Sequence, residues 1–226
     1  MKLSIVMPVL NEAADIEAAL RALAPFRARG VEVIVVDGGS RDGTAELSRP
    51  LADRVISAPR GRATQMNVGA AIAHGEVLLF LHADTRLPAD ADCIILDGLT
   101  HSGRGWGRFD VRFDGGGLGL VAFMMNWRSR LSGIATGDQA MFVARAAFDV
   151  TGGFPLIALM EDVALSARLK RFGRPLCLAV RVATSGRRWR KHGVLRTILL
   201  MWKLRLAFYF GADPVRLAQV YGYAER

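Results

Sequence analysis

The chain has 226 residues, of which 51% are hydrophobic and 23% are charged. This length suits one domain, or one domain with an appendage, and the hydrophobic content argues against intrinsic disorder. Lys and Arg number 30 against 21 Asp and Glu, which gives a net charge of +9. That charge favours an anionic partner such as a nucleotide, a lipid phosphate, a membrane surface or a nucleic acid.

The two cysteines and the hydropathy pattern indicate in which cellular compartment the protein is expected. Cys93 and Cys177 are far apart and lack metal-ligand spacing, so we expect two buried thiols in a reducing compartment and no disulfide or zinc site. The N-terminal apolar run is too short for a signal peptide. The longest apolar candidate, 194–210, is interrupted by three basic residues, so it does not read as a membrane span. We expect a cytoplasmic protein that can touch a membrane.

Strand and helix patterns alternate through the first half of the chain. Short apolar runs predict strands at 3–9, 31–36, 54–57 and 76–82, and helical spacing of apolar residues predicts helices at 12–29, 44–49 and 65–73. Runs of β-branched residues suit the interior of a parallel sheet that is buried on both faces. The alternation predicts an α/β fold with a mostly parallel central sheet flanked by helices.

The second half is less regular. Glycines and aromatic residues at 101–119 indicate turns with one or two antiparallel strands near 107–113, and residues 140–143 resemble another strand. Residues 161–172 predict a helix, because acidic residues begin it and basic residues end it, as the helix dipole favours. We find no repeat and no linker. We therefore expect one domain over residues 1–185.

The C-terminal segment, residues 186–226, is basic and apolar, and its centre at 194–210 has helical character. Arg196 and Lys203 share one helical face, but Arg205 lies nearly opposite Lys203. A clean amphipathic membrane helix would separate charge and apolar surface. We expect this segment to pack partly on the domain and partly on a membrane or a second subunit.

Polar residues follow three of the predicted strands. The three clusters are Asn11-Glu12, Asp37-Gly38-Gly39-Ser40 and His82-Ala83-Asp84-Thr85. In open α/β sheets, ligands bind outside the carboxyl ends of the strands. The sequence therefore predicts a ligand site along one edge of the sheet.

The turn after the second strand suits a nucleoside. The carboxylate of Asp37 can accept hydrogen bonds from a base or a ribose, and Gly39 lets a ligand approach the backbone. The alternative, equally favoured on this motif alone, is a tight turn in which Asp37 caps the next element.

The next strand ends in His82 and Asp84. Side chains at i and i+2 of an extended segment point to the same side, so both can face one ligand. An Asp in such a place can hold Mg²⁺ or Mn²⁺ on a diphosphate, because hard cations prefer oxygen ligands. The alternative is an Asp that caps a helix, beside a hydrogen-bonded His.

Paired carboxylates occur at Glu161-Asp162, near the start of a predicted helix. One of them can act as a general base on an acceptor hydroxyl. The more common explanation for such a pair, taken alone, is a favourable interaction of negative charge with the helix dipole.

Three further segments are candidates for ligand contact. The polar turn Gly137-Asp138-Gln139 either contacts an acceptor or marks a hairpin. The loop Arg60-Gly61-Arg62, near Gln65 and Asn67, can place guanidinium groups on phosphates or be a solvated surface loop. The cluster Arg187-Arg188-Trp189-Arg190-Lys191-His192 can bind a diphosphate, lipid headgroups or RNA, or be a surface patch.

Taken in order, these motifs resemble the family-2 glycosyltransferases of the GT-A fold. The set spans about residues 3–175 and is far more specific than any one member. Its blocks are the opening strand and turn Ser4-Ile5-Val6-Met7-Pro8-Val9-Leu10-Asn11-Glu12, the nucleotide-binding turn at 35–44, Asn67-Val68-Gly69, His82-Ala83-Asp84 at the place of the DxD motif, and Gly153-Phe154 followed by Glu161-Asp162.

The resemblance implies transfer of a sugar from a nucleotide-diphosphate sugar, most commonly a UDP-sugar, to an acceptor hydroxyl with inversion. Asp162 would be the general base, with Glu161 beside it. Asp84 would hold a divalent metal, Mn²⁺ or Mg²⁺, on the diphosphate, and Asp37 would bind the nucleobase or ribose. The nucleotide pocket would also include Pro8, Glu12, Gly39, Arg62, Asn67 and His82. The acceptor would contact Gly137, Asp138, Arg188 and Trp189.

Two departures from the family pattern qualify these expectations. His82 stands where the first Asp of DxD is expected, so the metal requirement rests on Asp84. Only Arg188-Trp189 echoes the QxxRW motif of processive members, with Ser185 at the Gln position, which argues against a processive polymer synthase. The compact motif set is also similar to a bacterial subgroup associated with arsenosugar biosynthesis.

Three other functions compete with this interpretation. A nucleotide-sugar nucleotidyltransferase would carry a Gly-rich basic loop where this chain has Leu10-Asn11-Glu12-Ala13. A non-catalytic nucleotide-sugar binding protein is disfavoured because Asp37, Asp84 and Asp162 are all present. A specific nucleic-acid binder is disfavoured because the chain has no reader motif and places acidic residues at its strand ends.

Overall fold

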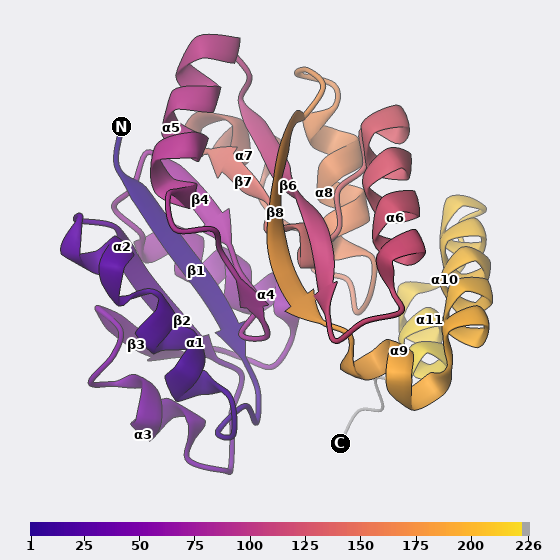
Figure 1. Cartoon of the computed structure of the whole chain (residues 1–226), viewed down its shortest axis with the longest axis horizontal. Helices are drawn as coiled ribbons and strands as arrows, with labels where there is room; N and C mark the ends of the chain where they lie inside the picture. The colour runs from indigo at the N-terminus through magenta and orange to yellow at the C-terminus, as the bar shows by residue number, and fades with distance from the viewer. Residues whose placement is uncertain (223–226) are drawn as a thin grey trace.

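The computed structural model describes residues 1–222, and an eight-stranded mixed sheet forms the centre of the fold (Figure 1). The sheet order is β3-β2-β1-β4-β7-β6-β8-β5. The strands are β1 Leu3–Val9, β2 Glu32–Asp37, β3 Arg54–Ser57, β4 Val77–Phe80, β5 Thr85–Arg86, β6 Trp106–Asp114, β7 Phe142–Ala144 and β8 Leu176–Ser185. Four neighbouring pairs are parallel and three are antiparallel, which confirms the predicted α/β fold.

Helices cover both faces of the sheet and extend beyond it on one side (Figure 1). The helices are α1 Ile16–Ala22, α2 Ala24–Ala28, α3 Thr44–Ser48, α4 Arg62–Ile72, α5 Ala91–Ser102, α6 Gly119–Ser132, α7 Arg145–Thr151, α8 Glu161–Leu169, α9 Arg187–His192, α10 Val194–Tyr209 and α11 Pro214–Tyr221, with the 3₁₀ turn η1 at Gly137–Gln139.

The alternation of side chains along β1 divides the core into two clusters. Ile5 and Met7 belong to the cluster that contains α1 and α5, whereas Val6 belongs to the cluster that contains α4, α7 and α8. Successive residues of a strand point to opposite faces, so a strand that is apolar throughout can serve two helical layers. A Cβ atom on Gly69 of α4 would lie 2.4 Å from a methyl carbon of Val6, so α4 can approach the sheet this closely only with glycine there.

The topological switch point of the sheet, where the order in which strands are added reverses, lies between β1 and β4. The chain proceeds from β1 outward through β2 and β3, then returns to place β4 on the other side of β1, and all four strands are parallel. The crevice beyond the carboxyl ends of two such strands is the usual ligand site of an open α/β sheet. The turns after β1 and β4 are those that carry Glu12 and Asp84.

Several predicted elements differ in detail from the structure. The helix expected at 12–29 is two short helices, because Pro25, in the first turn of α2, has no N–H with which to continue the hydrogen bonds of α1. The strand expected near 107–113 is β6, which is antiparallel to β7 but parallel to β8 along most of its length. The prediction of two buried thiols was wrong: Cys93 is exposed on α5 and Cys177 is half-buried in β8.

The C-terminal helices form a small apolar cluster of their own. Leu204 of α10 and Leu217 of α11 pack with Leu159 and Met160, the two residues before α8. No helix among the described residues combines the length and hydropathy that a membrane span requires. The last strand, β8, ends at Ser185, and the elements that follow it up to residue 222 are helices. The division into a domain at 1–185 and a segment at 186–226 stays a prediction, and residues 223–226 lie outside the described part of the chain.

Candidate functional site

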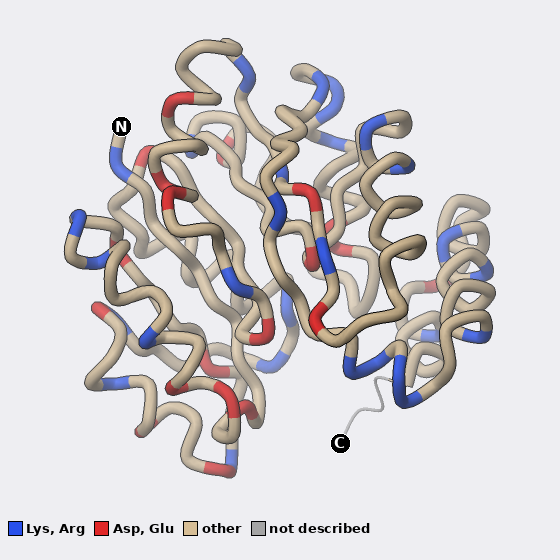
Figure 2. Tube along the Cα trace, in the orientation of Figure 1, with Lys and Arg blue, Asp and Glu red and all other residues tan. Residues whose placement is uncertain are grey.

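A cavity of about 680 Å³ lies at the switch point of the sheet. Its walls come from the turns after β1 and β4, the start of α4, η1, α9 and α11. Figure 2 shows acidic residues at the strand ends and basic residues along α9. The cavity is therefore acidic where the strands end and basic where the helices close it.

Three carboxylates face this cavity: Glu12, Asp84 and Asp138. Burial raises the pKa of Glu12 and of Asp84, and the positive charge of Arg62 opposes both shifts. Burial and the neighbouring Asp84 raise the pKa of Asp138 to about 6. Solvent still reaches Asp138 through the cavity, since 45% of its side chain is exposed. Carboxylates that repel each other in a cleft are the arrangement that a bound cation relieves.

His82 lines the cavity as an uncharged side chain. Burial and then the charge of Arg62 lower its pKa to about 3, so the imidazole is neutral at physiological pH. A Cβ atom on Gly137 would lie 2.4 Å from Cε1 of His82, so only glycine permits η1 to pack on this ring. His82 Nδ1 lies 3.9 Å from an Asp138 carboxylate oxygen, too far for a direct hydrogen bond.

Glu161 and Asp162 begin α8 directly behind η1. One Asp162 oxygen accepts a hydrogen bond from the backbone N–H of Gly137 at 2.8 Å, and the other accepts from the N–H of Val163 at 2.7 Å. Glu161 is 6% exposed. Burial, and then repulsion by Asp162, raise the pKa of Glu161 to about 7. The pair thus contains one carboxylate fixed by backbone donors and one whose pKa is raised by burial.

Backbone strain among residues 1–222 concentrates around these turns. Asn11 (φ 54°), Ala140 (φ 46°) and Met160 (φ 70°) are the non-glycine residues with positive φ in that range. Asn tolerates this region, but Ala and Met do so at a cost. Asn11 follows β1, Ala140 follows η1 and Met160 precedes Glu161. Strained residues of this kind cluster at functional sites.

The basic wall joins α9 to α11. The Arg188 guanidinium lies over the ring of Tyr221, 3.6 Å from its centroid, and donates a hydrogen bond to the Tyr221 carbonyl at 2.6 Å. Trp189 packs edge to face on Phe113 of β6, with ring centroids 5.7 Å apart. These contacts fix Arg188 and Trp189 in the wall of the cavity.

Asp37 does not reach the cavity wall. Its carboxylate accepts hydrogen bonds from the backbone N–H groups of Gly39 and Ser40 and from the Ser40 hydroxyl. This is the alternative in which Asp37 stabilises its own turn. Asn67 also lies outside the cavity lining. Its amide donates a hydrogen bond to the Phe154 carbonyl and accepts one from the Phe154 N–H. The proposed nucleotide contacts of Asp37, Gly39 and Asn67 stay predictions.

The structure therefore brings together part of the predicted site. The predicted residues that line the cavity are Pro8, Glu12, Arg62, His82, Asp84, Asp138, Arg188 and Trp189. Gly137 lies in η1 against the cavity residue His82, and Asp162, which with Glu161 begins α8, accepts a hydrogen bond from the Gly137 N–H. Asp37, Gly39 and Asn67 are separate from the cavity lining.

Sequence reasoning missed two parts of the site. Gln219 and Tyr221 of α11 line the cavity, and the signal for this helix was Asp213-Pro214, where Asp213 caps the N-terminus and proline occupies the first turn. Arg128 of α6 and Arg205 of α10 interact electrostatically with Asp162. Burial, and then Arg205, lower the pKa of Arg128 to about 9. No local motif indicates this pair, because it joins two helices far apart in sequence.

The donor set fits a divalent cation that is shared with a ligand. Among residues 1–222, no group of three or more His, Cys, Asp and Glu side chains is arranged to hold a metal without help. Mg²⁺ sites on nucleotides commonly use one or two carboxylates, with phosphate oxygens and water completing the shell. Asp84, with its burial-raised pKa and with Asp138 close by, matches that pattern.

Residues 4–146 match the sequence profile of Glycosyl transferase family 2. This chain belongs to that family. It is 37% identical over 91 residues to a PGL/p-HBAD biosynthesis glycosyltransferase of Mycobacterium bovis (strain BCG / Pasteur 1173P2), an alignment that covers 37% of this chain and 36% of the relative. It is 49% identical over 49 residues to the succinoglycan biosynthesis protein ExoA of Rhizobium meliloti (21% and 15% covered). The chain thus matches about a third or less of the length of these relatives.

Solved structures share the fold at low sequence identity. The mannosyltransferase PcManGT from Pyrobaculum calidifontis, in complex with GDP-Man and Mn²⁺, superposes with a TM-score of 0.69 at 20% identity, over 98% of this chain and 69% of that one. S. aureus TarS 1-349 in complex with UDP-GlcNAc superposes with a TM-score of 0.68 at 20% identity, over 82% and 58%. The core fold of this family-2 member is therefore GT-A-like.

Proposed function

We propose that this protein transfers a sugar from a nucleotide-diphosphate sugar to an acceptor hydroxyl, with inversion at the anomeric carbon. One observation carries the proposal. A single cavity at the switch point of the sheet sets carboxylates on the strand-end turns against guanidinium groups on the opposite helices. A metal–diphosphate requires both kinds of group.

On the donor side, the guanidinium groups of Arg62 and Arg187 bind the diphosphate, and Glu12 shapes the nucleotide pocket. Asp84 holds a divalent cation, Mn²⁺ or Mg²⁺, with the neutral His82 beside it. A cation there would neutralise negative charge on the leaving diphosphate. The donor nucleotide is uridine diphosphate, the commonest carrier of the family. Solved neighbours are complexed with UDP-GlcNAc or with GDP-Man, so the test below includes both nucleotides.

On the acceptor side, Asp162 is the general base. The acceptor oxygen forms a bond to the anomeric carbon as the bond from that carbon to the diphosphate oxygen breaks, and the hydroxyl proton passes to the Asp162 carboxylate. The two backbone N–H groups that donate to Asp162 orient it. Glu161 is its neighbour, and Gly137, Asp138, Arg188 and Trp189 contact the acceptor. Arg128 and Arg205 beside Asp162 favour an acceptor that carries negative charge.

The segment 194–210 is proposed to contact a membrane or a second copy of the chain. The side chains of Leu195, Leu199, Trp202 and Leu206 recur at helical spacing on α10, and each is at least 60% exposed. The similarity to the arsenosugar subgroup gains no support from the relatives reported above, and that substrate forms no part of the proposal.

Nucleotide binding tests the proposal directly. Thermal unfolding is measured with UDP, GDP, CDP and their sugar conjugates, each with and without Mn²⁺, on the wild type and on Asp84→Ala. A ligand at about a hundred times its dissociation constant stabilises the fold by roughly 2.7 kcal/mol. We expect one diphosphate to stabilise the wild type, and Asp84→Ala to lose the part of this gain that depends on Mn²⁺.

Asp97→Ala is the matched control, because Asp97 is exposed on α5, away from the cavity lining. It should retain the whole effect. If no nucleotide shifts the melting temperature at any metal concentration, the proposed function is wrong. If a nucleotide sugar binds but is never turned over with any acceptor, the non-catalytic binding protein replaces it.

A further inference from the structure

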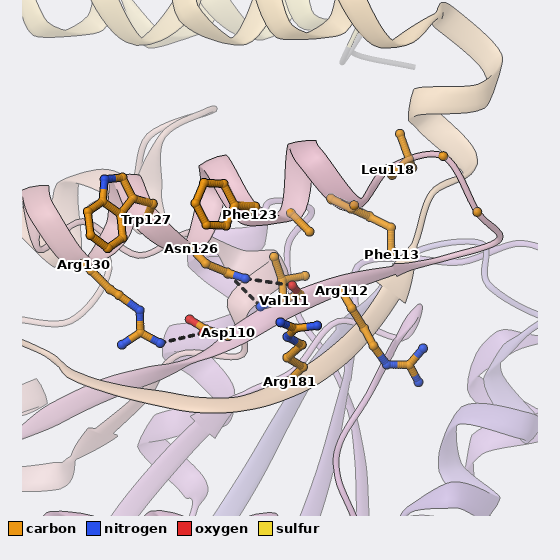
Figure 3. A pocket seen from close by; sticks show the side chains of 14 residues that line it. Asp110, Val111, Arg112, Phe113, Leu118, Phe123, Asn126, Trp127, Arg130 and Arg181 are labelled. Atoms are coloured by element: carbon orange, nitrogen blue, oxygen red, sulfur yellow. Dashed lines mark hydrogen bonds and ion pairs between the residues drawn. The ribbon is translucent and has the colours of Figure 1, made fainter.

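A second cavity of about 530 Å³ lies between α6 and the strands β6 and β8. Figure 3 shows Arg112, Arg130 and Arg181 around it, with Phe123 and Trp127 projecting from α6. Phe113 lines both this cavity and the one described above. The two cavities thus share a wall but have otherwise different linings, and the function proposed above leaves the second without a role.

Positive charge dominates this second cavity. Its one carboxylate, Asp110, is already paired with two guanidinium groups: Arg130, at 2.6 Å, and Arg108. Arg112 is 3.5 Å from Asp114, with both side chains about half exposed. Arg181 is exposed, and its side chain makes no hydrogen bond or ion pair with any residue of the range 1–222. A ligand anion can therefore approach Arg181 and Arg112 without displacing a strong partner.

The rim of the cavity is apolar and unusually exposed. Phe123 and Trp127 stack almost parallel, with ring centroids 6.5 Å apart and 7° between the planes. The Phe123 side chain is 64% exposed and that of Trp127 is 56% exposed. Leu120 and Leu131, both exposed, continue the same spacing along α6. This row, Leu120, Phe123, Trp127 and Leu131, is called the α6 row below.

Charge around the α6 row favours an anionic lipid over a second copy of the chain. Residues 115–137, which contain α6, include no Asp or Glu, and neither do residues 163–212, which contain β8, α9 and α10. Residues 115–137 carry Arg128 and Arg130, and residues 163–212 carry both Lys and Arg. Two copies that met through this face would bring like charges together, whereas anionic headgroups attract them. Trp at a membrane surface lies at the headgroup level, where its ring meets both polar and apolar groups.

We propose that this cavity binds the phosphate headgroup of an anionic phospholipid in a bilayer, with the α6 row inserted among the acyl chains. Arg181 and Arg112 contact the phosphate, and Arg130, held by Asp110, forms the floor of the site. The site is independent of sugar transfer, so its test requires no activity.

Vesicle flotation tests the site with full-length protein. The vesicles contain phosphatidylcholine alone, or phosphatidylcholine with phosphatidylglycerol. We expect binding only where phosphatidylglycerol is present. Arg181→Ala should lower the partition coefficient about fivefold, which is the effect of about one cation at an anionic surface. Phe123→Ser should also lower it, because the apolar contact is lost.

The chain offers a matched pair of control variants. Arg171 is exposed and has no ion pair with a described residue, and Phe172 is 63% exposed, almost the value of Phe123. Arg171→Ala and Phe172→Ser should leave the partition coefficient unchanged. If Arg171→Ala lowers binding as much as Arg181→Ala, the attraction is diffuse and the proposed site is overturned.

Two further measurements distinguish a lipid from a soluble phosphate. Brominated phosphatidylglycerol should quench tryptophan fluorescence in the wild type, and Trp127→Phe should lose the part of that quenching that comes from the α6 row, whereas Trp202→Phe should retain it. Free glycerol phosphate, without vesicles, should bind far more weakly than the lipid. If glycerol phosphate binds tightly and vesicles do not, the cavity is a site for a soluble anion and the lipid proposal is overturned.

Discussion

The two sides of the cavity at the switch point of the sheet are built differently. On the strand side, the turn after β1 is tied to the loop that follows β2: the backbone N–H groups of Asn11, Glu12 and Ala13 donate to side chains of Ser40, Thr44 and Asp42. On the helix side, α9 has only six residues, none of them buried. Arg188 reaches Tyr221 and Arg190 reaches the Asp114 carbonyl, and few other hydrogen bonds hold it.

This difference suits the strand side to holding reactive groups in place and the helix side to admitting and releasing substrates. Groups that act on reacting atoms must be held closely in place, and a turn fixed by several hydrogen bonds at the end of a buried strand does so. A wall of exposed helices opens at a lower free energy and can admit and release substrates. We therefore expect substitutions on the strand and η1 side to lower the rate of chemistry, and substitutions on the α9 and α11 side to weaken binding.

The largest effect should come from Asp162. Asp162→Asn removes the proposed proton acceptor while the amide keeps an oxygen for one of the two backbone N–H groups, so kcat should fall by about 100-fold or more with little change in KM. The measurement is steady-state kinetics with the donor found in the nucleotide-binding test.

Asp138→Asn is the comparison for this change. Asp138 faces the cavity directly, and its pKa of about 6 would make activity rise through pH 6 if Asp138 took the proton. If Asp138→Asn has the larger effect on kcat and abolishes such a pH dependence, Asp138 is the base and the assignment of Asp162 is wrong.

Arg188→Ala should have an intermediate effect, on binding alone. It removes the contact of α9 with Tyr221 and one cation from the cavity wall. We expect KM or Kd to rise about 10-fold, in line with the loss of one charged hydrogen bond, with kcat unchanged. Lys191→Ala, an exposed cation on the same helix, should leave both constants as they are. A fall in kcat in Arg188→Ala would contradict the separation of the two sides.

The smallest effect concerns stability. The pKa of Glu161 is about 7 in the folded protein and near 4.5 when unperturbed, so the folded state binds its proton more tightly than the unfolded state. Its contribution to stability is present below about pH 4.5 and is lost as the pH rises through 7. The wild type should therefore lose on the order of 1–3 kcal/mol of unfolding free energy between pH 5 and pH 8 through this group. Glu161→Gln should not show this loss, so its stability relative to the wild type should rise by that amount between the two pH values.

Denaturant unfolding at both pH values measures this difference. Glu46→Gln, a change at an exposed acidic residue of α3, should show no such dependence on pH. If Glu161→Gln and the wild type lose stability equally between pH 5 and pH 8, the carboxyl of Glu161 is not the group that titrates.

Pattern reasoning succeeded where local sequence and the sheet agree. Parallel strands bring their carboxyl ends to one edge, so Glu12 and Asp84 could be placed together without a structure. The pattern could not decide which way a turn side chain points, and Asp37 binds its own loop instead. The buried face of α6 could not be predicted from the spacing of its apolar residues. Its large aromatic residues, Phe123 and Trp127, are exposed. Arg128 and Arg205 meet Asp162 only through tertiary packing.

The backbone at Gly137 links the turn after β4 to the first turn of α8. Its α-carbon packs on the His82 ring, and its N–H group donates a hydrogen bond to the Asp162 carboxylate. Under the proposed function, a movement of His82 on arrival of the sugar nucleotide would reach the carboxylate proposed as general base through this one residue. Such a link would give the two substrates a kinetic order, in which binding of the first prepares the site of the second, and water would meet no activated base before both are bound.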